Sequence, residues 1–355
     1  MKVIIDPRCN YMYSSYYIQG LIEVFGQKNI SYSMKYFRQL NMKAESHSFD
    51  HYFAFVIINS KYSCDFISYK KIIVDFRDKN TIKENAYNWC DIYAKVNFNK
   101  ELTDSKFFPK IISIPPSFGV RVYGFAETVL LAISNLIKSN FSISTSIKNY
   151  ILNYIFTFML RAPINKYIVP QKSLNDYIFF ISSLRTDDIC INKTNKLRYL
   201  FIKKAKNDSI LFEGGFKGSI KNPEYEKYKD AVFTKRYSIN DYIKKSKESC
   251  VVFNTPAVHN CHGWKLGEFL AMGKAIISTT LSNDLPENLK HGINIHFVKD
   301  DKDIEDAIKK ILNNTDYKET LENNSKIYFD KIAAPANVIK TIFTSAYKGE
   351  NNLAN

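Results

Sequence analysis

The stretch NCHGWKLGEFLAMGKAIIS, residues 260–278, brings a lysine and a glutamate into the first turns of an expected helix. Gly263 stands near the helix start, where exposed backbone amides bind anions. Lys265 adds a positive charge there, and Glu268 follows one turn later, where a carboxylate can accept hydrogen bonds from two neighbouring hydroxyls. A solvated face of an amphipathic helix is the alternative, and we expect Glu268 itself to be solvated. The spacing fits a nucleotide, with its diphosphate on the amides and Lys265 and its ribose on Glu268.

A second set of basic residues follows the apolar run 177–184. Arg185 would suit a diphosphate because a guanidinium binds phosphate with two parallel hydrogen bonds, and Lys193 or Lys196 would add a point charge. The alternative for Arg185 is a surface charge at a strand end. The sequence EGG that ends at Gly215 is expected to close another strand, where it either lines a site or forms a turn.

Acids and histidines near expected strand ends in the first half of the chain are candidates for a general base. These are Asp6, Asp75 and Asp78, and more weakly His47 and His51. Asp75 and Asp78 flank Arg77, so a local ion pair is the alternative for each of them.

The sequence predicts no metal site. The DKD sequence at 301–303 lies at a helix start, where acids are expected as caps. His259 and His262 flank Cys261, but no further ligand is spaced to complete a set. His262 is therefore a candidate to face a ligand directly, and no cofactor is expected.

Short apolar runs that alternate with helical patterns must position these residues. The expected strands are 2–6, 53–59, 71–76, 92–97, 110–115, 177–184, 209–215, 230–235, 250–256, 273–279 and 294–298. Residues 301–314 form an amphipathic helix with acids first and lysines later, as the helix dipole favours. This alternation predicts parallel sheets covered by helices on both faces.

The chain divides into two doubly wound, Rossmann-like α/β domains that face each other across a cleft. The expected boundaries are 1–165, whose residues 117–162 are helical and basic, then 166–330, then a C-terminal helix and tail at 331–355 that packs back toward the first domain. Ligands of such folds bind outside the carboxyl ends of the strands.

Residues 170–310 resemble the donor domain of GT-B glycosyltransferases, most of all glycosyltransferase family 4. The resemblance lies in GWKLGEFLAMGKAIIS followed by LPENLKHGINIHFV. It implies a nucleotide-diphosphate-sugar donor bound by Gly263, Trp264, Lys265 and Glu268, with Glu268 on the ribose. Asn260 occupies the position of the family's first glutamate, near the donor sugar.

The resemblance also implies how transfer is catalysed. Arg185 and Lys193 or Lys196 would hold the donor pyrophosphate, and a departing diphosphate can be neutralised by cations and helix amides without a metal. A retaining mechanism is favoured. The alternative is an inverting enzyme with a carboxylate base, such as Asp75, from the first domain.

The net charge of +15 indicates anionic partners. Residues 105–165 hold six cations against the single acid Glu127, beside apolar helices, so this segment is expected to meet an anionic membrane surface. A glycan or lipid-linked acceptor would be met there, as in cell-surface polysaccharide synthesis. A reducing cytosol is expected, because the cysteines form no CxxC pair.

Two other functions stay open. A basic chain with many aromatic residues could bind nucleic acid, although its cations are dispersed and nucleic acid is not the expected partner. A non-catalytic sugar-binding protein is favoured only by Asn260.

Overall fold

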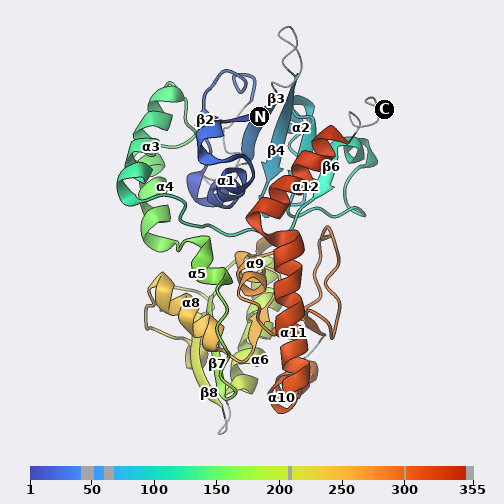
Figure 1. Ribbon diagram of the computed structural model, residues 1–355. Coiled ribbons are helices and arrows are strands. Elements are labelled where there is room, and N and C mark those ends of the chain that lie inside the picture. The colour runs from blue at the N-terminus through green and yellow to red at the C-terminus, as the bar shows by residue number, and fades with distance from the viewer. Residues whose placement is uncertain (41–51, 60–67, 207–209, 300, 349–355) are drawn as a thin grey trace. The chain divides into compact units, whose positions relative to one another are not determined.

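The computed structural model describes residues 1–40, 52–59, 68–206, 210–299 and 301–348 (Figure 1). The chain forms two compact units. Unit 1 comprises Met1–Ile164, Asp284–Pro286 and Ile332–Asn355, and unit 2 comprises Asn165–Asn283 and Glu287–Lys331. Both units combine helices with a mainly parallel sheet, which confirms the predicted α/β class.

The sheet of unit 1 has the strand order β2-β1-β3-β4-β5-β6. The strands are β1 (Lys2–Ile5), β2 (Ile30–Tyr32), β3 (Phe53–Asn59), β4 (Ser68–Asp75), β5 (Ile92–Lys95) and β6 (Ile111–Ser113). The predicted all-parallel arrangement is wrong for β3, which runs antiparallel to both β1 and β4. Only residues 60–67 separate β3 from β4, and a parallel crossover needs about a dozen residues or more.

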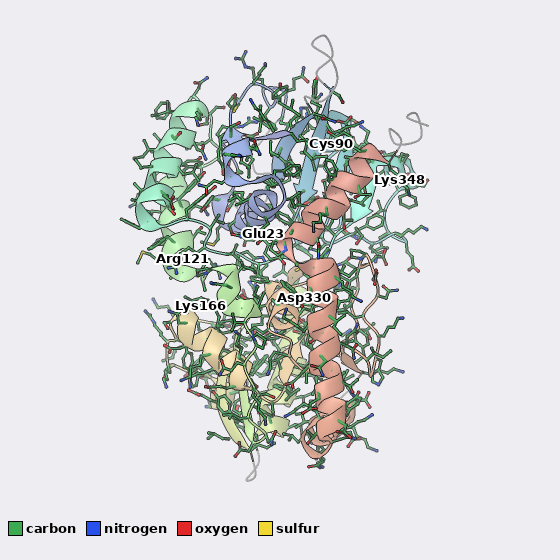
Figure 2. All side chains as sticks on the ribbon, viewed as in Figure 1. Glu23, Cys90, Arg121, Lys166, Asp330 and Lys348 are labelled. Atoms are coloured by element: carbon green, nitrogen blue, oxygen red, sulfur yellow. The ribbon has the colours of Figure 1, made fainter. Side chains whose placement is uncertain are left out.

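The described part of unit 1 also holds five α-helices, of which α3 packs on α4: α1 (Tyr11–Phe25), α2 (Glu84–Trp89), α3 (Phe125–Lys138), α4 (Ile147–Leu160) and α12 (Pro335–Tyr347). The side chain of Asn10 caps α1. Helix α12 packs closely on α1. A Cβ atom at Gly20 would lie only 2.3 Å from the Pro335 carbonyl oxygen, so a larger residue at this position would clash. Cys90, labelled in Figure 2, is buried at the end of α2.

All strand pairs of unit 2 are parallel. The strands are β7 (Tyr177–Ser183), β8 (Leu211–Lys217), β9 (Val252–Asn254), β10 (Ile276–Thr279) and β11 (His296–Val298). They form two groups, β7-β8 and β11-β10-β9. The Cys250 amide donates to the Tyr177 carbonyl at 2.8 Å and brings β9 next to β7. The resulting order β8-β7-β9-β10-β11 is that of a doubly wound fold.

The predicted strand at 230–235 does not form. Residues Lys229–Ala231 make a single 3-10 turn, and Val232 forms only an isolated bridge with Phe216. One hydrogen bond, from the Phe233 amide to the Phe216 carbonyl, joins this segment to β8. A strand needs a continuous ladder, so the segment stays extended beside the sheet without joining it.

The helices of unit 2 are α5 (Ile164–Ile168), α6 (Asn195–Ala205), α7 (Tyr225–Tyr228), α8 (Ile239–Glu248), α9 (Trp264–Ala271), α10 (Asp301–Asn313) and α11 (Thr315–Tyr328). The predicted helix at 301–314 is confirmed as α10. Phe201 on α6 stacks on Phe253 of β9 with ring centroids 4.5 Å apart, in the centre of the core. Among the described residues, no helix is both long and apolar enough to cross a membrane.

Candidate functional site

The start of helix α9 lies beyond the carboxyl end of β9. Gly263 is its N-cap and supplies no side-chain hydrogen bond, so the amides of the first turn have no side-chain cap. A Cβ atom at this position would make only ordinary contact with Ala257, at 3.8 Å. The glycine is therefore not required by packing, and its effect is to leave the helix start open to an anion.

Lys265 turns its ammonium group into unit 2. The group donates a hydrogen bond to the Ile181 carbonyl of β7 and lies 4.8 Å from the ring centroid of Phe180. Burial and the positive charge of Arg198 together lower the pKa of Lys265 to about 7, while Glu268 opposes the shift. Lys265, the predicted phosphate ligand, is thus only partly protonated near neutral pH.

Arg198 on α6 is the site residue that the sequence analysis missed. It is 8% exposed, and its Nε donates to Thr255 Oγ1 at 2.9 Å, just beyond β9. Its Nη1 lies 3.5 Å from the Ser183 carbonyl at the end of β7. Burial lowers the pKa of this guanidinium to about 10, and nearby Arg185 contributes to the shift.

The position of Arg198 in the sequence carried a signal. Helix α6 buries Asn195, Arg198, Phe201, Ile202 and Ala205, a spacing that places them on one helical face. An arginine among the apolar residues of that face must enter the interior.

Arg185 follows β7 and has an exposed side chain. Its backbone is held by buried Asn195, which accepts from the Arg185 amide at 3.3 Å and donates to its carbonyl at 2.8 Å. Arg185, Arg198 and Lys265 form an electrostatically connected series, since each of the first two lowers the pKa of the next. Lys193 and Lys196 are exposed, and the structure gives neither a contact with this series among the described residues.

Glu268 is buried rather than solvated, which corrects the expectation from sequence. It is 5% exposed and accepts a hydrogen bond from the Tyr242 hydroxyl at 2.7 Å. Burial raises the pKa of Tyr242, and the charge of Glu268 raises it further, so the phenol remains a donor. Tyr242 lies on α8, and its pairing with a helix 26 residues away could not be read from spacing.

The loop before α9 has an unusual backbone. His259 and Asn260 both have φ near +57°, while His262 is buried and Trp264 is partly buried. Asparagine tolerates the left-handed region better than most residues, and glutamate gains no such relief there. The backbone therefore gives a local reason for an asparagine at 260, whose side chain is exposed and whose carbonyl accepts from Asn283 at 3.1 Å.

Gly215 lies inside a strand and not at its end, because β8 continues to Lys217. Its φ is +144°, and a Cβ atom there would lie 2.3 Å from the Ala231 carbonyl oxygen. Gly214 is equally constrained, since its Cβ would lie 2.0 Å from the Phe180 carbonyl oxygen. Close packing of β8 therefore accounts for both glycines.

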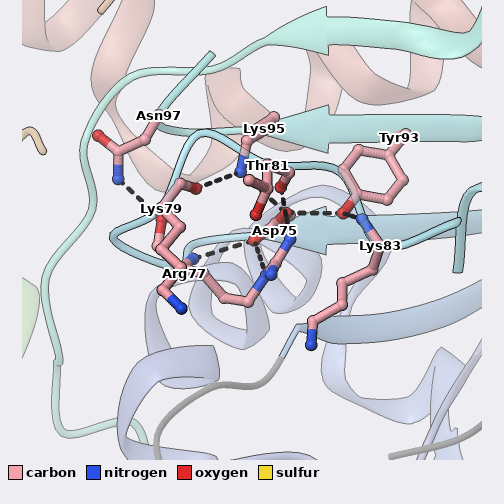
Figure 3. A network of polar contacts seen from close by, with 8 residues as sticks. All are labelled: Asp75, Arg77, Lys79, Thr81, Lys83, Tyr93, Lys95 and Asn97. Atoms are coloured by element: carbon pink, nitrogen blue, oxygen red, sulfur yellow. Dashed lines mark hydrogen bonds and ion pairs between the residues drawn. The ribbon is translucent and has the colours of Figure 1, made fainter. Parts of the chain in front are cut away.

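Asp75 is enclosed in a network of donors at the end of β4 (Figure 3). It is fully buried and accepts from Arg77 at 2.7 Å, Tyr93 at 2.6 Å and Lys95 at 2.9 Å. Burial by itself would raise the pKa of Asp75, but the charges of Arg77 and Lys95 hold it well below its usual range. A carboxylate so fully bonded is a poor proton acceptor and serves to fix the turn after β4.

Asp6 repeats this arrangement after β1. Its carboxylate accepts from Arg8 at 2.6 Å, and the same guanidinium donates to the carbonyls of Phe37 and Leu40. Asp78 is exposed. The remaining base candidates, His47 and His51, lie outside the described residues.

Metal ligands are not gathered anywhere in the described part of the chain. Asp303 of the DKD sequence accepts from the Lys299 amide at 3.0 Å, as a residue at a helix start would.

A hollow of about 320 Å³ opens beyond the carboxyl end of β1 in unit 1. Its wall includes Arg8, Asn10, Asn149, Asn153 and Phe156. Asn153 donates to Asn10 at 3.1 Å and accepts from the Met12 amide at 3.1 Å. Because Asp6 neutralises Arg8, the wall offers amide and apolar groups with little net charge.

No protein-family model matches the chain, and no curated protein sequence matches it significantly. Among solved structures, the chain is similar to a TarM mutant of S. aureus in complex with fondaparinux, alpha-GlcNAc-glycerol and UDP. The identity is 12% and the TM-score 0.44, over 76% of this chain and 48% of that one. The chain thus spans about half the length of TarM.

Two further similar structures come from other bacteria. HepE of Anabaena in complex with UDP-glucose is 10% identical with a TM-score of 0.42, over 75% of this chain and 67% of that one. A glycosyltransferase of Rickettsia africae is 12% identical with a TM-score of 0.38, over 77% and 67%. At such identities the likenesses concern the course of the chain and assign no activity.

Proposed function

We propose that the protein is a glycosyltransferase that uses a nucleotide-diphosphate sugar. One observation carries the proposal: Arg198 and Lys265 bring buried positive charge to the carboxyl ends of β7 and β9, next to the open start of α9. Among the described residues, no carboxylate lies within ion-pair distance of either group.

Two cations drawn into unit 2, with no described carboxylate at ion-pair distance, are costly to the protein alone. A diphosphate would neutralise both and accept from the α9 amides, which is the arrangement that a departing nucleoside diphosphate requires. The cations themselves supply the charge stabilisation, so transfer proceeds without a metal or another cofactor.

Glu268 then takes the ribose, and Tyr242 is a positioning residue that holds its carboxylate. Arg185 enters from solvent to reach the phosphates with Arg198, and Lys193 contributes long-range attraction. Gly263 and Trp264 form the helix start, with His262 and Asn260 toward the donor sugar. We favour a retaining mechanism, because the saturated hydrogen bonds of Asp75 argue against the inverting alternative with that residue as base.

The amide-lined hollow of unit 1 suits the acceptor. Amide groups donate to and accept from sugar hydroxyls, and Phe156 offers an apolar wall for a ring. An uncharged wall favours a neutral glycan, either free or carried on a lipid. We propose a role in cell-surface polysaccharide synthesis on the cytoplasmic side of an anionic membrane.

Isothermal calorimetry with UDP, GDP and ADP on the parent and on Glu268→Gln tests the donor site. We expect one nucleotide to bind the parent and Glu268→Gln to lose roughly 1.5–3 kcal/mol of binding, the scale of a hydrogen bond to a charged group. Because Tyr242 still finds an acceptor in glutamine, the free energy of unfolding should fall by only about 1 kcal/mol. The exposed residue Glu319 provides the matched control, Glu319→Gln.

Equal affinity in Glu268→Gln and the parent would show that the ribose does not meet Glu268. Sugar turnover separates an enzyme from a non-catalytic sugar-binding protein. A salt-dependent mobility shift with random DNA or RNA, without nucleotide-sugar binding, would instead favour the nucleic-acid alternative.

A further inference from the structure

Helices α3 and α4 pack side by side and form a hairpin, residues 125–160, on unit 1 (Figure 1). Among the described residues, 18 large hydrophobic side chains are exposed, and nine of them lie on this hairpin. They are Phe125, Leu130, Ile133, Ile137, Phe141, Ile147, Phe156, Met159 and Leu160. Half of the exposed large apolar groups are thus concentrated in a tenth of the chain, which is how an interaction surface differs from ordinary scatter.

The hairpin buries polar side chains and exposes apolar ones, which is unusual for helices that face water. The buried residues of α3 are Thr128, Ala132, Asn135 and Leu136, and those of α4 are Tyr150, Tyr154 and Thr157. Asn135 donates to the Tyr154 hydroxyl at 3.1 Å between the two helices. Polar groups such as Thr128, Asn135 and Thr157 are therefore buried while several leucine and isoleucine side chains face outward, unlike the usual surface helix of a soluble protein.

On α3 the outward groups form a stripe. Leu130, Ile133 and Ile137 follow at intervals of three and four residues and are 67%, 47% and 60% exposed. At the turn into α4, Asn140 and Phe141 have φ of +51° and +57°, and the Phe141 side chain remains 58% exposed. The strained backbone leaves an aromatic side chain in solvent, where water gives it no favourable contact.

The charge of the surface is one-sided. Residues 128–175 contain no aspartate or glutamate. The exposed Lys138 and Lys148 lie at the two ends of the turn that joins the helices. Near the base of the hairpin, Arg121 (labelled in Figure 2) lies 5.1 Å from the ring centroid of Phe158.

We infer that the α3–α4 hairpin is the part of the protein that binds an anionic lipid bilayer, with its apolar stripe among the acyl chains and its lysines at the headgroups. Apolar side chains together with a cationic border that holds the single acid Glu127 match this partner, because membrane binding by interfacial helices adds apolar burial to attraction for anionic lipid. A second copy of the chain would meet the same cations and be repelled by them. The inference is independent of the proposed donor chemistry, which concerns unit 2.

Co-sedimentation with vesicles of phosphatidylcholine alone, or with added phosphatidylglycerol, tests the inference on the full chain without nucleotide. We expect binding to the anionic vesicles at low salt and release at high salt. Ile133→Ser combined with Ile137→Ser should reduce partitioning at least tenfold, and Lys138→Gln combined with Lys148→Gln roughly tenfold.

Matched controls change equally exposed groups elsewhere. Leu102→Ser replaces a side chain that is 72% exposed in unit 1, and Lys28→Gln combined with Lys221→Gln removes two exposed charges. These variants should bind vesicles like the parent, and circular dichroism checks that every variant is folded.

Three results would overturn the inference. They are no binding to anionic vesicles, equal binding to both kinds of vesicle, or hairpin variants that bind like the controls. A dimer that dissociates in Ile133→Ser with Ile137→Ser, seen by light scattering without vesicle binding, would instead identify a self-association surface. Calorimetry with nucleotides remains a separate measurement, so loss of the donor proposal would leave the vesicle result unchanged.

Discussion

Two groups of buried cations in this protein are neutralised in different ways. In unit 1, Arg77 and Lys95 both reach the buried carboxylate of Asp75 at ion-pair distance. In the described part of unit 2, Arg198 and Lys265 donate to a hydroxyl and to backbone carbonyls and reach no carboxylate at ion-pair distance. The difference separates a network whose carboxylate lies at its centre from a pair of cations that contact neutral acceptors, the pair at which we propose that an anion binds.

The partners of a buried cation indicate whether it can still bind an external ligand. A buried ion pair with all its hydrogen bonds made holds a turn in one geometry, as the Asp75 network does after β4. Cations held by neutral acceptors keep most of their attraction for an anion, and the low pKa of Lys265 reflects its burial and the positive charge of Arg198, which Glu268 offsets only in part. Burial of a charge is therefore less informative than the identity of its partners.

The largest expected effect comes from breaking the complete network. Asp75→Asn leaves Arg77 and Lys95 buried without their carboxylate, so the free energy of unfolding should fall by about 3–5 kcal/mol. Urea denaturation followed by circular dichroism measures it, with Asp78→Asn, an exposed neighbour, as the control. A variant of unchanged stability that has lost turnover would instead identify Asp75 as a catalytic base.

A smaller effect, on binding rather than on folding, is expected in unit 2. Arg198→Met removes an uncompensated charge and keeps an apolar stem, so the free energy of unfolding should stay equal or rise. Nucleoside-diphosphate binding should weaken roughly 10–100-fold, the scale of a lost charged hydrogen bond. Calorimetry and urea denaturation on the same variant measure both, with Arg236→Met as the exposed control. If Arg198→Met loses stability and still binds nucleotide, Arg198 is a structural residue like those of the Asp75 network, and the proposed difference between the cations of unit 1 and unit 2 is wrong.

The smallest expected effect near neutral pH is a dependence of stability and nucleotide affinity on pH. The pKa of Lys265 is about 7 in the folded protein against an ordinary 10.5, so the unfolded chain binds more protons between these values. Stability should therefore rise with pH across this window, and Lys265→Met should flatten the rise. Nucleotide affinity should change in the opposite direction and weaken above pH 7, because phosphate favours the protonated lysine.

Urea midpoints and calorimetric affinities at several pH values, on the parent and on Lys265→Met, measure this dependence. The difference between the two proteins isolates Lys265 from other groups such as Lys274, whose pKa burial lowers to about 8. Identical pH profiles would mean that Lys265 is solvated and holds its charge without an anion.

Much of the local structure could be predicted from the sequence. Apolar runs of strand length identified every described strand except β2, although the run at 230–235 forms none, and acids followed by lysines identified α10. The antiparallel direction of β3 was missed because a run of apolar residues does not show whether the strand pairs parallel or antiparallel. The short link to β4 was the signal that could have supplied it.

The sequence by itself determined the α/β class and the residues that begin α9, because hydrophobic period and helix-start chemistry are local properties. It also placed Arg185, Lys265 and Glu268 on the elements that carry them. Only the tertiary structure decided that Arg198 lies near both Arg185 and Lys265. It alone also decided that Tyr242 donates to a buried Glu268 and that Lys95 helps to neutralise Asp75. These pairings connect residues on different elements, and their burial fixes how strongly each charge is felt, which no spacing along the chain encodes.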